Sequence, residues 1–324
     1  MTILVTGAAG FIGFHTCKAL VARGETVLGL DNVNGYYDVD LKQARLEQLL
    51  SQKNFTFVEM DISDNDALER AVSGQKIHAV LHLAAQAGVR YSIENPKVYA
   101  DTNLQGFFNV LEYARNSGVA NVVYASSSSI YGGNTKMPFA EDDVTDTPVS
   151  FYAATKKSNE LMAHSYAHLY GISLTGLRFF TVYGEWGRPD MAYWIFSEKL
   201  RRNEPVQIFN NGDMSRDFTY IDDIVTGVIA AIDRPASALG LDVPHRVYNL
   251  GNDKPEKLMD LVGCIEKAFG QELIKEFQPM QLGDVERTWA DISRARKELG
   301  FNPHTSLEEG IERFASWFKF WKMR

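Results

Sequence analysis

The sequence is poor in cysteine, with only Cys17 and Cys264 among 324 residues. Two cysteines so far apart supply neither a metal-binding spacing nor a redox pair, and so low a content is typical of a reducing cytoplasm. The sequence also lacks an apolar run of the about 18 residues that a membrane-spanning helix needs, and it lacks a basic leader with a cleavage pattern. We therefore expect a cytoplasmic protein without a metal site, a disulfide framework or a membrane span.

Positive charge is also in deficit. Lysine and arginine number 33 against 41 aspartates and glutamates, which gives a formal net charge of -8. A chain with this balance repels nucleic acid and anionic lipid overall, although a local basic pocket for a small phosphorylated ligand remains compatible with it. With 45% hydrophobic and 23% charged residues, the composition is that of a globular protein, and the length suits about two domains.

Short apolar runs alternate with helical patterns in the first half of the chain. We expect strands at 2–5, 26–30, 55–60, 79–83, 121–125 and 173–178, and helices at 11–23, 39–50, 64–73, 98–116 and 152–170. This alternation predicts a Rossmann-type, doubly wound parallel α/β sheet with helices on both faces. It weakens after residue 178. We therefore expect a first domain over 1–178 and a smaller mixed α/β domain over 179–324, some segments of which return to the first.

Three glycines, Gly7, Gly10 and Gly13, follow the first expected strand and open the first helix. Glycines there let the backbone turn tightly and approach a diphosphate, which the N–H groups of the helix N-terminus can bind. Asp31 ends the second strand, where a carboxylate can accept hydrogen bonds from ribose hydroxyls and would repel a 2′-phosphate. The pattern predicts binding of NAD rather than NADP; the alternative is a glycine turn beside a surface aspartate.

Tyr152 and Lys156 stand four residues apart at the start of an expected helix, so the phenol and the ammonium share one face. A positive charge about 4 Å away would stabilise the phenolate by about 4 kcal/mol at an effective dielectric near 20, which would lower the pKa of the tyrosine from about 10 by about three. Such a phenolate could act as a general base. Ser127 lies in a serine run at the end of the fifth strand, where its hydroxyl can hydrogen-bond a substrate oxygen.

These motifs together resemble the extended short-chain dehydrogenases/reductases, and within them the NAD-dependent sugar-nucleotide epimerases. The resemblance covers nearly the whole chain and rests on residues 7–13, 31, 126–132, 152–156 and 178–184. Three longer strings are similar to UDP-glucuronate 4-epimerases and are more specific than the general motifs. They are residues 31–38, 87–92 and 186–191.

The resemblance implies a set of site residues. The expected catalytic residues are Tyr152, Lys156 and Ser127. The expected contacts to NAD are Gly7, Gly10, Phe11, Ile12, Gly13, Asp31, Asn32, Asp61, Ile62, Leu83, Ala84, Ala85, Asn103, Tyr152, Lys156 and Phe180. The expected contacts to a UDP-sugar are Arg90, Ser127, Ser128, Tyr152, Thr181, Arg188, Met191, Phe209, Arg216 and Asp284. Galactose-type epimerases have an arginine three residues before the position of Asp284, where this chain has Gln281, so diphosphate binding would depend on Arg216 with help from Arg287.

The reaction implied by the resemblance is reversible C4 epimerisation of UDP-glucuronate to UDP-galacturonate through a transient 4-keto intermediate, as a step in supplying polysaccharide precursors. That intermediate is a β-keto acid, which loses carbon dioxide readily, and we expect Arg188 to pair with the C6 carboxylate and oppose this loss. The neighbours of Ser127 are serines, not acids, which favours epimerisation over dehydration or decarboxylation.

Three alternatives remain open at this stage. They are a UDP-glucose/galactose 4-epimerase, a UDP-glucuronate decarboxylase, and a non-catalytic NAD-binding redox sensor, although a sensor would typically lack the Tyr152/Lys156 pair. The resemblance also implies a homodimer formed through the helices at 98–116 and 152–170.

Overall fold

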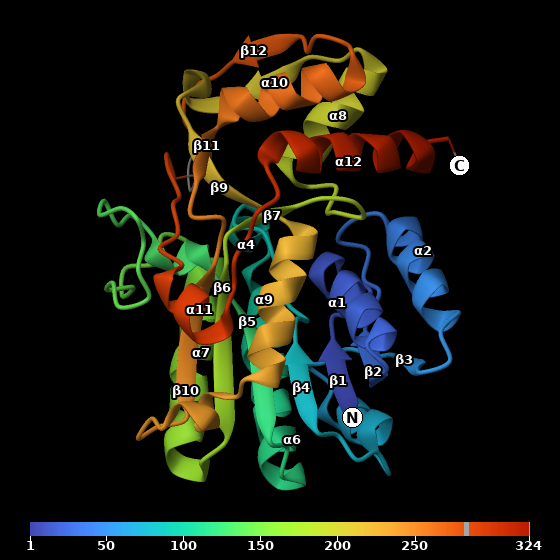
Figure 1. Ribbon diagram of the computed structural model, residues 1–324, viewed down its shortest axis with the longest axis vertical. Coiled ribbons are helices and arrows are strands. Elements are labelled where there is room, and N and C mark those ends of the chain that lie inside the picture. The colour runs from blue at the N-terminus through green and yellow to red at the C-terminus, as the bar shows by residue number, and fades with distance from the viewer. Residues whose placement is uncertain (282–284, 324) are drawn as a thin grey trace.

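The computed structural model describes residues 1–281 and 285–323, and its centre is a seven-stranded sheet (Figure 1). The strands lie in the order β10-β6-β5-β4-β1-β2-β3, and all neighbours are parallel. Their bounds are Thr2–Thr6 (β1), Thr26–Asp31 (β2), Phe55–Glu59 (β3), Ala79–His82 (β4), Asn121–Ser127 (β5), Ser173–Phe179 (β6) and His245–Leu250 (β10). The order reverses between β1 and β4, and ligands of such sheets bind at the carboxyl ends of the strands beside this point.

Both faces of the sheet are buried, as the nearly continuous apolar strands predict. Ile3 and Val5 of β1 belong to one apolar cluster and Leu4 to another, because successive side chains point to opposite faces. One face is covered by α1 (Phe11–Ala22), α2 (Val39–Leu50) and α9 (Ile221–Asp233), and the other by α3 (Asn65–Val72), α6 (Phe107–Ser117) and α7 (Phe151–Tyr170) (Figure 1). The predicted Rossmann-type fold is confirmed.

One expected helix, at 98–116, is not regular. The chain forms a short helix α5 (Pro96–Tyr99), a π-helical segment η1 (Ala100–Gly106) and then α6. Two contacts explain the irregular segment: the Asn103 side chain is tied to the loop after β4, and Gly106 lies so close to Ile62 that a Cβ would be 2.5 Å from its Cγ2. π-Bulges are frequent at functional sites.

The smaller part of the molecule lies beyond the carboxyl ends of the large sheet (Figure 1). It holds a three-stranded sheet of β7 (Thr181–Tyr183), β9 (Ser215–Tyr220) and β11 (Pro255–Lys257), and a pair of β8 (Val206–Ile208) with β12 (Lys275–Phe277). Three helices, α8 (Ala192–Arg202), α10 (Leu258–Phe269) and α12 (Leu307–Trp321), surround these strands. Three aromatic residues of α12, Phe314, Trp317 and Phe318, are buried, and Phe314 packs against Trp194.

Two elements of the second half of the chain belong to the large sheet. β10 pairs with β6 over six residues, from His245–Leu174 to Leu250–Phe179, and α9 packs against α1. His245 and Arg246 open this strand in register with Leu174 and Thr175 of β6. A domain boundary at residue 178 stays a prediction.

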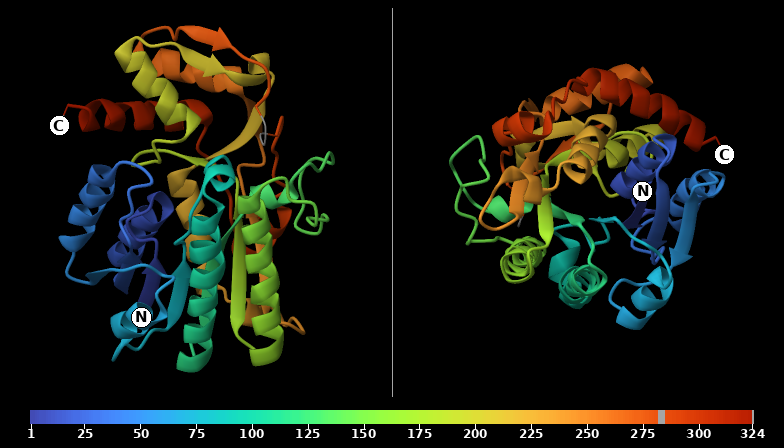
Figure 2. Two further views of the ribbon diagram at one scale, coloured as in Figure 1. Left: turned by 180° about the vertical axis from the view of Figure 1, so that it is seen from behind. Right: turned by 60° about the horizontal axis from the view of Figure 1, so that its bottom comes forward.

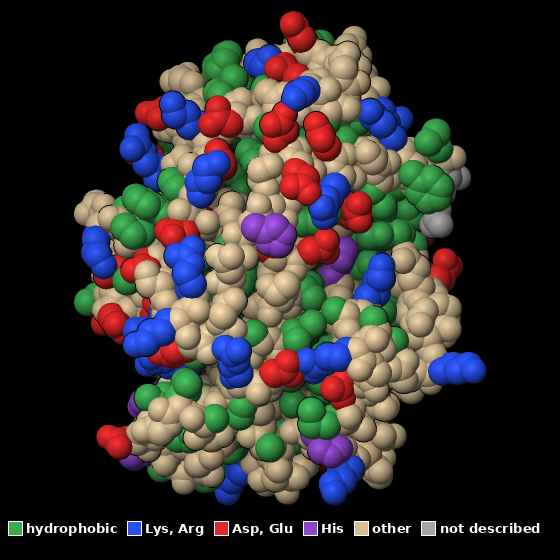
Figure 3. Space-filling model, viewed as in Figure 1, with side chains coloured by type: hydrophobic (Ala, Val, Ile, Leu, Met, Phe, Trp, Pro, Cys, Tyr) green, Lys and Arg blue, Asp and Glu red, His purple; other side chains and the backbone are tan. Residues whose placement is uncertain are grey.

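Charge is mixed on the molecular surface. Acidic and basic side chains are interspersed over the face shown in Figure 3. None of the helices that the structure describes is long and apolar enough to cross a bilayer. In the described ranges, no cluster of three or more His, Cys, Asp or Glu side chains is placed to hold a metal ion.

Candidate active site

The glycine turn lies at the carboxyl end of β1, as predicted, and the backbone there leaves no room for side chains. Gly7 has a φ of +76°, and a Cβ on it would lie 2.7 Å from the backbone nitrogen of Ala84. A Cβ on Gly13 would lie 2.0 Å from the carbonyl oxygen of Gly7. The turn therefore offers bare backbone and the N-terminus of α1, which is the donor set that a dinucleotide diphosphate requires.

Asp31 is oriented by the backbone at the end of β2. Its Oδ2 accepts from Ala9 N at 3.1 Å and its Oδ1 from Val33 N at 2.8 Å, which leaves acceptor sites for ribose hydroxyls. Burial raises the pKa of Asp31, against the lowering effect of the Val33 N–H. Together with the glycine turn, this carboxylate gives a site whose chemistry fits NAD.

A second carboxylate follows β3. Asp61 accepts from Asn32 Nδ2 at 2.8 Å and from the hydroxyl of Ser63 at 2.6 Å. Burial acts to raise the pKa of Asp61, but the hydrogen bonds from Ser63 and Asn32 outweigh it and hold that pKa below its usual value. Asn32 and Asp61, both predicted cofactor contacts, are therefore neighbours at the edge of the predicted dinucleotide site.

The other predicted cofactor contacts surround the same strand ends. Leu83, Ala84 and Ala85 follow β4 and are half-buried, while Phe11, Ile62 and Phe180 are buried and Ile12 is half-buried on α1. Asn103 is only 1% exposed, and its amide bonds Gln86 N (2.8 Å), Gln86 O (3.0 Å) and the hydroxyl of Thr155 (3.0 Å). The side chain of Asn103 thus ties η1 to the loop after β4 and to α7; a direct contact to NAD stays a prediction.

The structure brings the three predicted catalytic residues together. Ser127 ends β5, and Tyr152 and Lys156 lie on successive turns at the start of α7, which Ser150 caps by accepting from Ala153 N. Lys156 is 2% exposed and donates through Nζ to the Ala125 carbonyl at 3.0 Å, two residues before Ser127. Ser128 follows Ser127 and opens the 3-10 turn η2 (Ser128–Tyr131).

The expected depression of the tyrosine pKa by Lys156 is wrong for the chain by itself. Burial raises the pKa of Tyr152, and the hydrogen bond with Ser127 and the positive charge of Arg188 act only partly against it. Burial also lowers the pKa of Lys156 to about 8. The Lys156 ammonium is bound to a main-chain carbonyl. The cost of placing a charge in a buried site is the largest contribution to the pKa of both Tyr152 and Lys156.

Arg188, the predicted contact of the sugar carboxylate, already forms an ion pair within the protein, which the sequence argument did not predict. Its guanidinium binds Asp190 through Nε (3.0 Å) and Nη2 (2.5 Å), and Tyr36 donates to the same carboxylate at 3.1 Å. Burial acts to lower the pKa of Arg188, but Asp190 outweighs it and raises that pKa above its usual value. The sequence argument did not predict that Asp190 and Tyr36 contact Arg188. An aspartate two residues after an arginine is too common to indicate an ion pair, and Tyr36 is distant in the sequence.

Three sequence strings that resemble UDP-glucuronate 4-epimerases therefore meet in space. Tyr36 belongs to the string at 31–38, Asp190 to that at 186–191, and Gly88 to that at 87–92, where a Cβ would lie 2.5 Å from the Tyr36 hydroxyl. Tyr91 and Tyr99 continue the contact toward the catalytic residues, with the Tyr99 ring edge-on to Tyr152 at 6.0 Å. The three strings form one wall beside Tyr152.

The remaining predicted substrate residues lie on the smaller part of the molecule or face it. Arg90 lies over the ring of Phe209 at 5.5 Å, Thr181 opens β7 and Met191 immediately precedes α8. Arg216 on β9 donates to the carbonyls of Ser215 (2.9 Å) and Glu286 (3.0 Å). Arg287 pairs loosely with Asp213 at 3.8 Å, and Asp284 lies outside the described residues.

A buried carboxylate that the sequence argument missed lies behind the catalytic residues. Glu160 accepts from Ser126 Oγ at 2.6 Å and forms a bidentate pair with Arg178 of β6 at 2.9 and 2.8 Å; both side chains are at most 6% exposed. Glu160 lies four residues after Lys156 on α7, so helical spacing from the Tyr152/Lys156 pair was the available signal. The ion pair holds β6 against α7, and the hydrogen bond from Ser126 holds the end of β5 to the same carboxylate.

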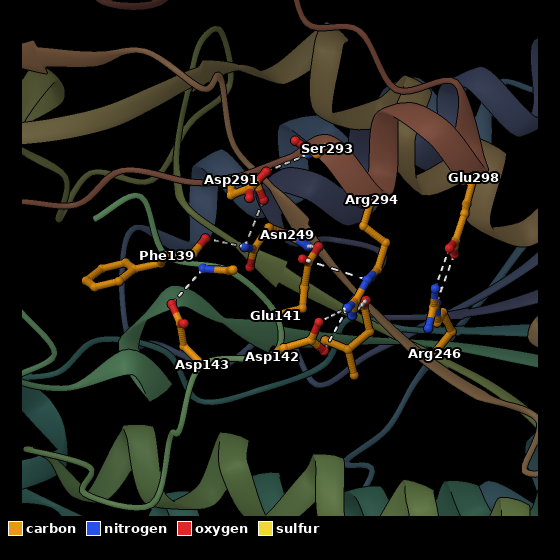
Figure 4. A network of polar contacts seen from close by, with 12 residues as sticks. Phe139, Glu141, Asp142, Asp143, Arg246, Asn249, Asp291, Ser293, Arg294 and Glu298 are labelled. Carbon is orange, nitrogen blue, oxygen red and sulfur yellow. Dashed lines mark hydrogen bonds and ion pairs between the residues drawn. The ribbon is translucent and has the colours of Figure 1, made fainter. Parts of the chain in front are cut away.

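The loop before α7 is held by a polar network with β10 and α11 (Figure 4). Asn249 on β10 donates to the carbonyls of Phe139 (2.8 Å) and Asp291 (3.1 Å), and Arg294 on α11 (Ser293–Leu299) binds both oxygens of Asp142 at 2.7 Å. The segment that leads into Tyr152 is therefore held by elements from the end of the chain.

Comparison with known proteins agrees with this geometry. The model of the NAD dependent epimerase/dehydratase family matches residues 3–251. The chain belongs to this family. Members of the family with named activities are similar to it over nearly its whole length. A probable UDP-glucuronate 4-epimerase of Rhizobium meliloti is 47% identical over 98% of this chain and 97% of its own. UDP-glucuronate 4-epimerase 4 of Arabidopsis thaliana is 48% identical over 98% of this chain and 75% of its own.

A solved structure extends the family likeness to three dimensions. The UDP-glucuronic acid 4-epimerase from Bacillus cereus, in complex with UDP-glucuronic acid and NAD, superposes with a TM-score of 0.92 at 35% identity, covering 99% of this chain and 100% of its own. The protein is thus an NAD-dependent epimerase of the UDP-sugar 4-epimerase type.

Proposed function

We propose that the protein interconverts UDP-glucuronate and UDP-galacturonate at C4 of the sugar. The observation that carries this proposal is the meeting of Ser127, Tyr152 and Lys156 at the edge of the sheet that also carries the glycine turn, with the positive charge of Arg188 acting on the Tyr152 phenol. The similar UDP-glucuronate 4-epimerases support it, and so does the similar structure that contains UDP-glucuronic acid and NAD.

In this mechanism, bound NAD would accept a hydride from C4 and, once reduced, would return it to C4. Tyr152 removes the proton of the C4 hydroxyl as the ketone forms and gives a proton back when the ketone is reduced. Ser127 donates a hydrogen bond to the same oxygen. Lys156, held by the Ala125 carbonyl, lies one helical turn after Tyr152, and the positive charge of Arg188 favours the phenolate.

Product analysis tests the proposal. Purified protein is incubated with UDP-glucuronate, and the nucleotides are separated and identified by mass and proton NMR. Formation of UDP-galacturonate supports the proposal. Formation of a UDP-pentose identifies a decarboxylase, and turnover of UDP-glucose without turnover of UDP-glucuronate identifies a hexose epimerase; either result rejects it.

Arg188→Ala is expected to impair recognition of the uronate. We expect KM for UDP-glucuronate to rise about 30-fold or more, equivalent to about 2 kcal/mol, because the C6 carboxylate would lose its charged partner. A keto-pentose by-product is expected as well, since the β-keto acid is no longer held. Steady-state kinetics and product analysis measure both effects. Arg115→Ala, an exposed arginine on α6, is the control, and an unchanged KM with no by-product in Arg188→Ala rejects the role.

We also propose that two copies of the chain associate through α6 and α7. Figure 2 shows these helices side by side on the outer face, with no element over them. Their outward residues include large apolar side chains that are at least 41% exposed: Phe108, Phe151, Leu161 and Leu169. Such a stripe on paired helices suits a four-helix contact with a second copy.

A charge in this stripe is expected to prevent association. Leu161, 60% exposed on α7, becomes glutamate in the test variant, because an unpaired charge cannot be buried between two copies without a large cost. Light scattering after size exclusion should give twice the chain mass of 36.4 kDa for the parent and the single mass for Leu161→Glu. Val144→Glu, at a 70% exposed loop position, should remain dimeric. A monomeric parent rejects the proposal.

A cytoplasmic location completes the proposal. Both cysteines are free thiols, Cys17 buried and Cys264 half-buried, as is usual for proteins of a reducing compartment. The partners we propose are limited to NAD, the UDP-sugar and a second copy of the chain, without nucleic acid or membrane.

A further inference from the structure

Arg45 is a fully buried arginine with an unusual set of partners. It lies in the middle of α2 and is 0% exposed. Its guanidinium donates to the carbonyls of Ala9 (2.8 Å), Trp186 (3.1 and 2.5 Å) and Gly187 (3.0 Å), and to the hydroxyl of Tyr37 (2.8 Å). None of the ion pairs in the described part of the chain includes Arg45.

The carbonyls that Arg45 binds belong to two functional segments far apart in the sequence. Ala9 lies inside the glycine turn, between Gly7 and Gly10. Trp186 and Gly187 immediately precede Arg188. One planar group therefore connects the predicted diphosphate site to the loop that carries the predicted uronate contact. In Figure 1 the segment that follows β7 reaches across toward α2, the helix that carries Arg45.

The loop needs an external support at this point. Trp186 has a φ of +59°, a left-handed conformation that a bulky side chain rarely adopts. Gly187 is closely confined, since a Cβ there would lie 1.7 Å from the Tyr193 hydroxyl. Both guanidinium bonds to the Trp186 carbonyl oppose relaxation of this strained residue, and strained segments persist only where surrounding structure over-determines them.

We propose that Arg45 is a positioning residue for uronate recognition: it fixes the strained loop to the glycine turn and thereby sets the direction of Arg188. This inference rests on the proposed role of Arg188. The Asp190 ion pair occupies the Nε edge of Arg188, so the remaining edge of the guanidinium can meet a carboxylate only if the loop holds it toward the sugar.

The planar shape of arginine is what this role requires. Its five donors spread over a rigid fork and reach acceptors on two sides, whereas the three donors of lysine originate from one atom. Arg45→Lys therefore keeps the buried positive charge but cannot span from Ala9 to Gly187. Tyr37→Phe is the matched control, because it removes one partner of Arg45 and leaves both sets of carbonyl contacts intact.

Binding measured by calorimetry in a Tyr152→Phe background, with NAD present, tests the inference without catalysis. For Arg45→Lys, Kd for UDP-glucuronate is expected to rise about tenfold, within the range for coupled neighbouring residues. Kd for UDP-glucose, which has no carboxylate, should change less than about twofold. Tyr37→Phe should bind both nucleotides as the parent does. Equal weakening of both nucleotides by Arg45→Lys would overturn the inference, because it would indicate a general structural defect.

A double-mutant cycle separates this inference from the proposed function. In an Arg188→Ala background, Arg45→Lys should no longer change Kd for UDP-glucuronate. An undiminished effect in that background overturns the positioning role of Arg45. If Arg188→Ala alone leaves Kd unchanged, the proposed role of Arg188 is wrong instead. Circular dichroism verifies folding of each variant, and Arg45→Gln replaces Arg45→Lys in the cycle if the lysine variant does not fold.

Discussion

Tyr152→Phe is expected to lower kcat for epimerisation of UDP-glucuronate about 10³-fold, within the range by which a positioned acid–base group accelerates a reaction. The substitution removes only the phenol oxygen, the atom that exchanges a proton with C4. The ring keeps its edge-on contact with Tyr99 at 6.0 Å, so the fold and the binding of UDP-glucuronate should be preserved. Steady-state kinetics and calorimetric titration with UDP-glucuronate measure the two properties separately.

Tyr166→Phe is the matched control for this experiment. Tyr166 lies on the same helix, and its hydroxyl donates to Glu112 at 2.7 Å, far along α7 from the catalytic turn. It should retain the kcat of the parent. If Tyr152→Phe interconverted the two uronate nucleotides at the rate of the parent, acid–base catalysis by this phenol would be excluded.

Gly13→Ala should abolish retention of NAD and destabilise the protein. The added methyl carbon would lie 2.0 Å from the Gly7 carbonyl oxygen and 2.8 Å from the Gly7 carbonyl carbon, so the turn itself must move. Overpacking of this kind costs about 1–3 kcal/mol, and a displaced turn no longer presents its N–H groups to the diphosphate. Absorbance of cofactor released on denaturation measures NAD content, and thermal unfolding measures stability.

Gly263→Ala gives the contrasting result. Gly263 is exposed inside α10, and a Cβ there meets no atom within 4 Å. Alanine in the interior of a helix is favoured over glycine by about 0.5–1 kcal/mol, so this variant should be slightly more stable and keep its NAD. A Gly13→Ala protein that retains NAD and melts with the parent would show that the turn tolerates a side chain and does not hold the diphosphate.

Local patterns predicted the large sheet well because each of its strands carries its own signal. β1, β2 and β5 are buried on both faces, and the apolar runs that predict them differ from the observed strands by only a residue or two at their ends. The π-helical segment at Ala100–Gly106 left no such signal. It depends on Asn103 bonding Gln86 and on Gly106 meeting Ile62, and both contacts join residues that are distant in the sequence.

The same division holds for the site. Gly7, Gly13, Tyr152 and Lys156 were predicted at the places where the structure has them, because their spacing alone puts them on a turn or a helix face. Arg45 could not be predicted, since its partners Trp186 and Gly187 lie more than a hundred residues away. The direction of the Tyr152 pKa was wrong because a charge–charge argument from spacing omits burial, and burial outweighs the other contributions.

The position of β10 in the large sheet determines which surfaces stay exposed while the protein is synthesised. β6 is complete at Phe179, but the strand that covers its edge ends at Leu250 and the helix α9 that packs on α1 ends at Asp233. While the ribosome makes the intervening residues, the nascent chain has an open strand edge and an uncovered apolar face, both of which invite aggregation. A gene truncated between these elements would therefore yield an insoluble half rather than an autonomous nucleotide-binding module.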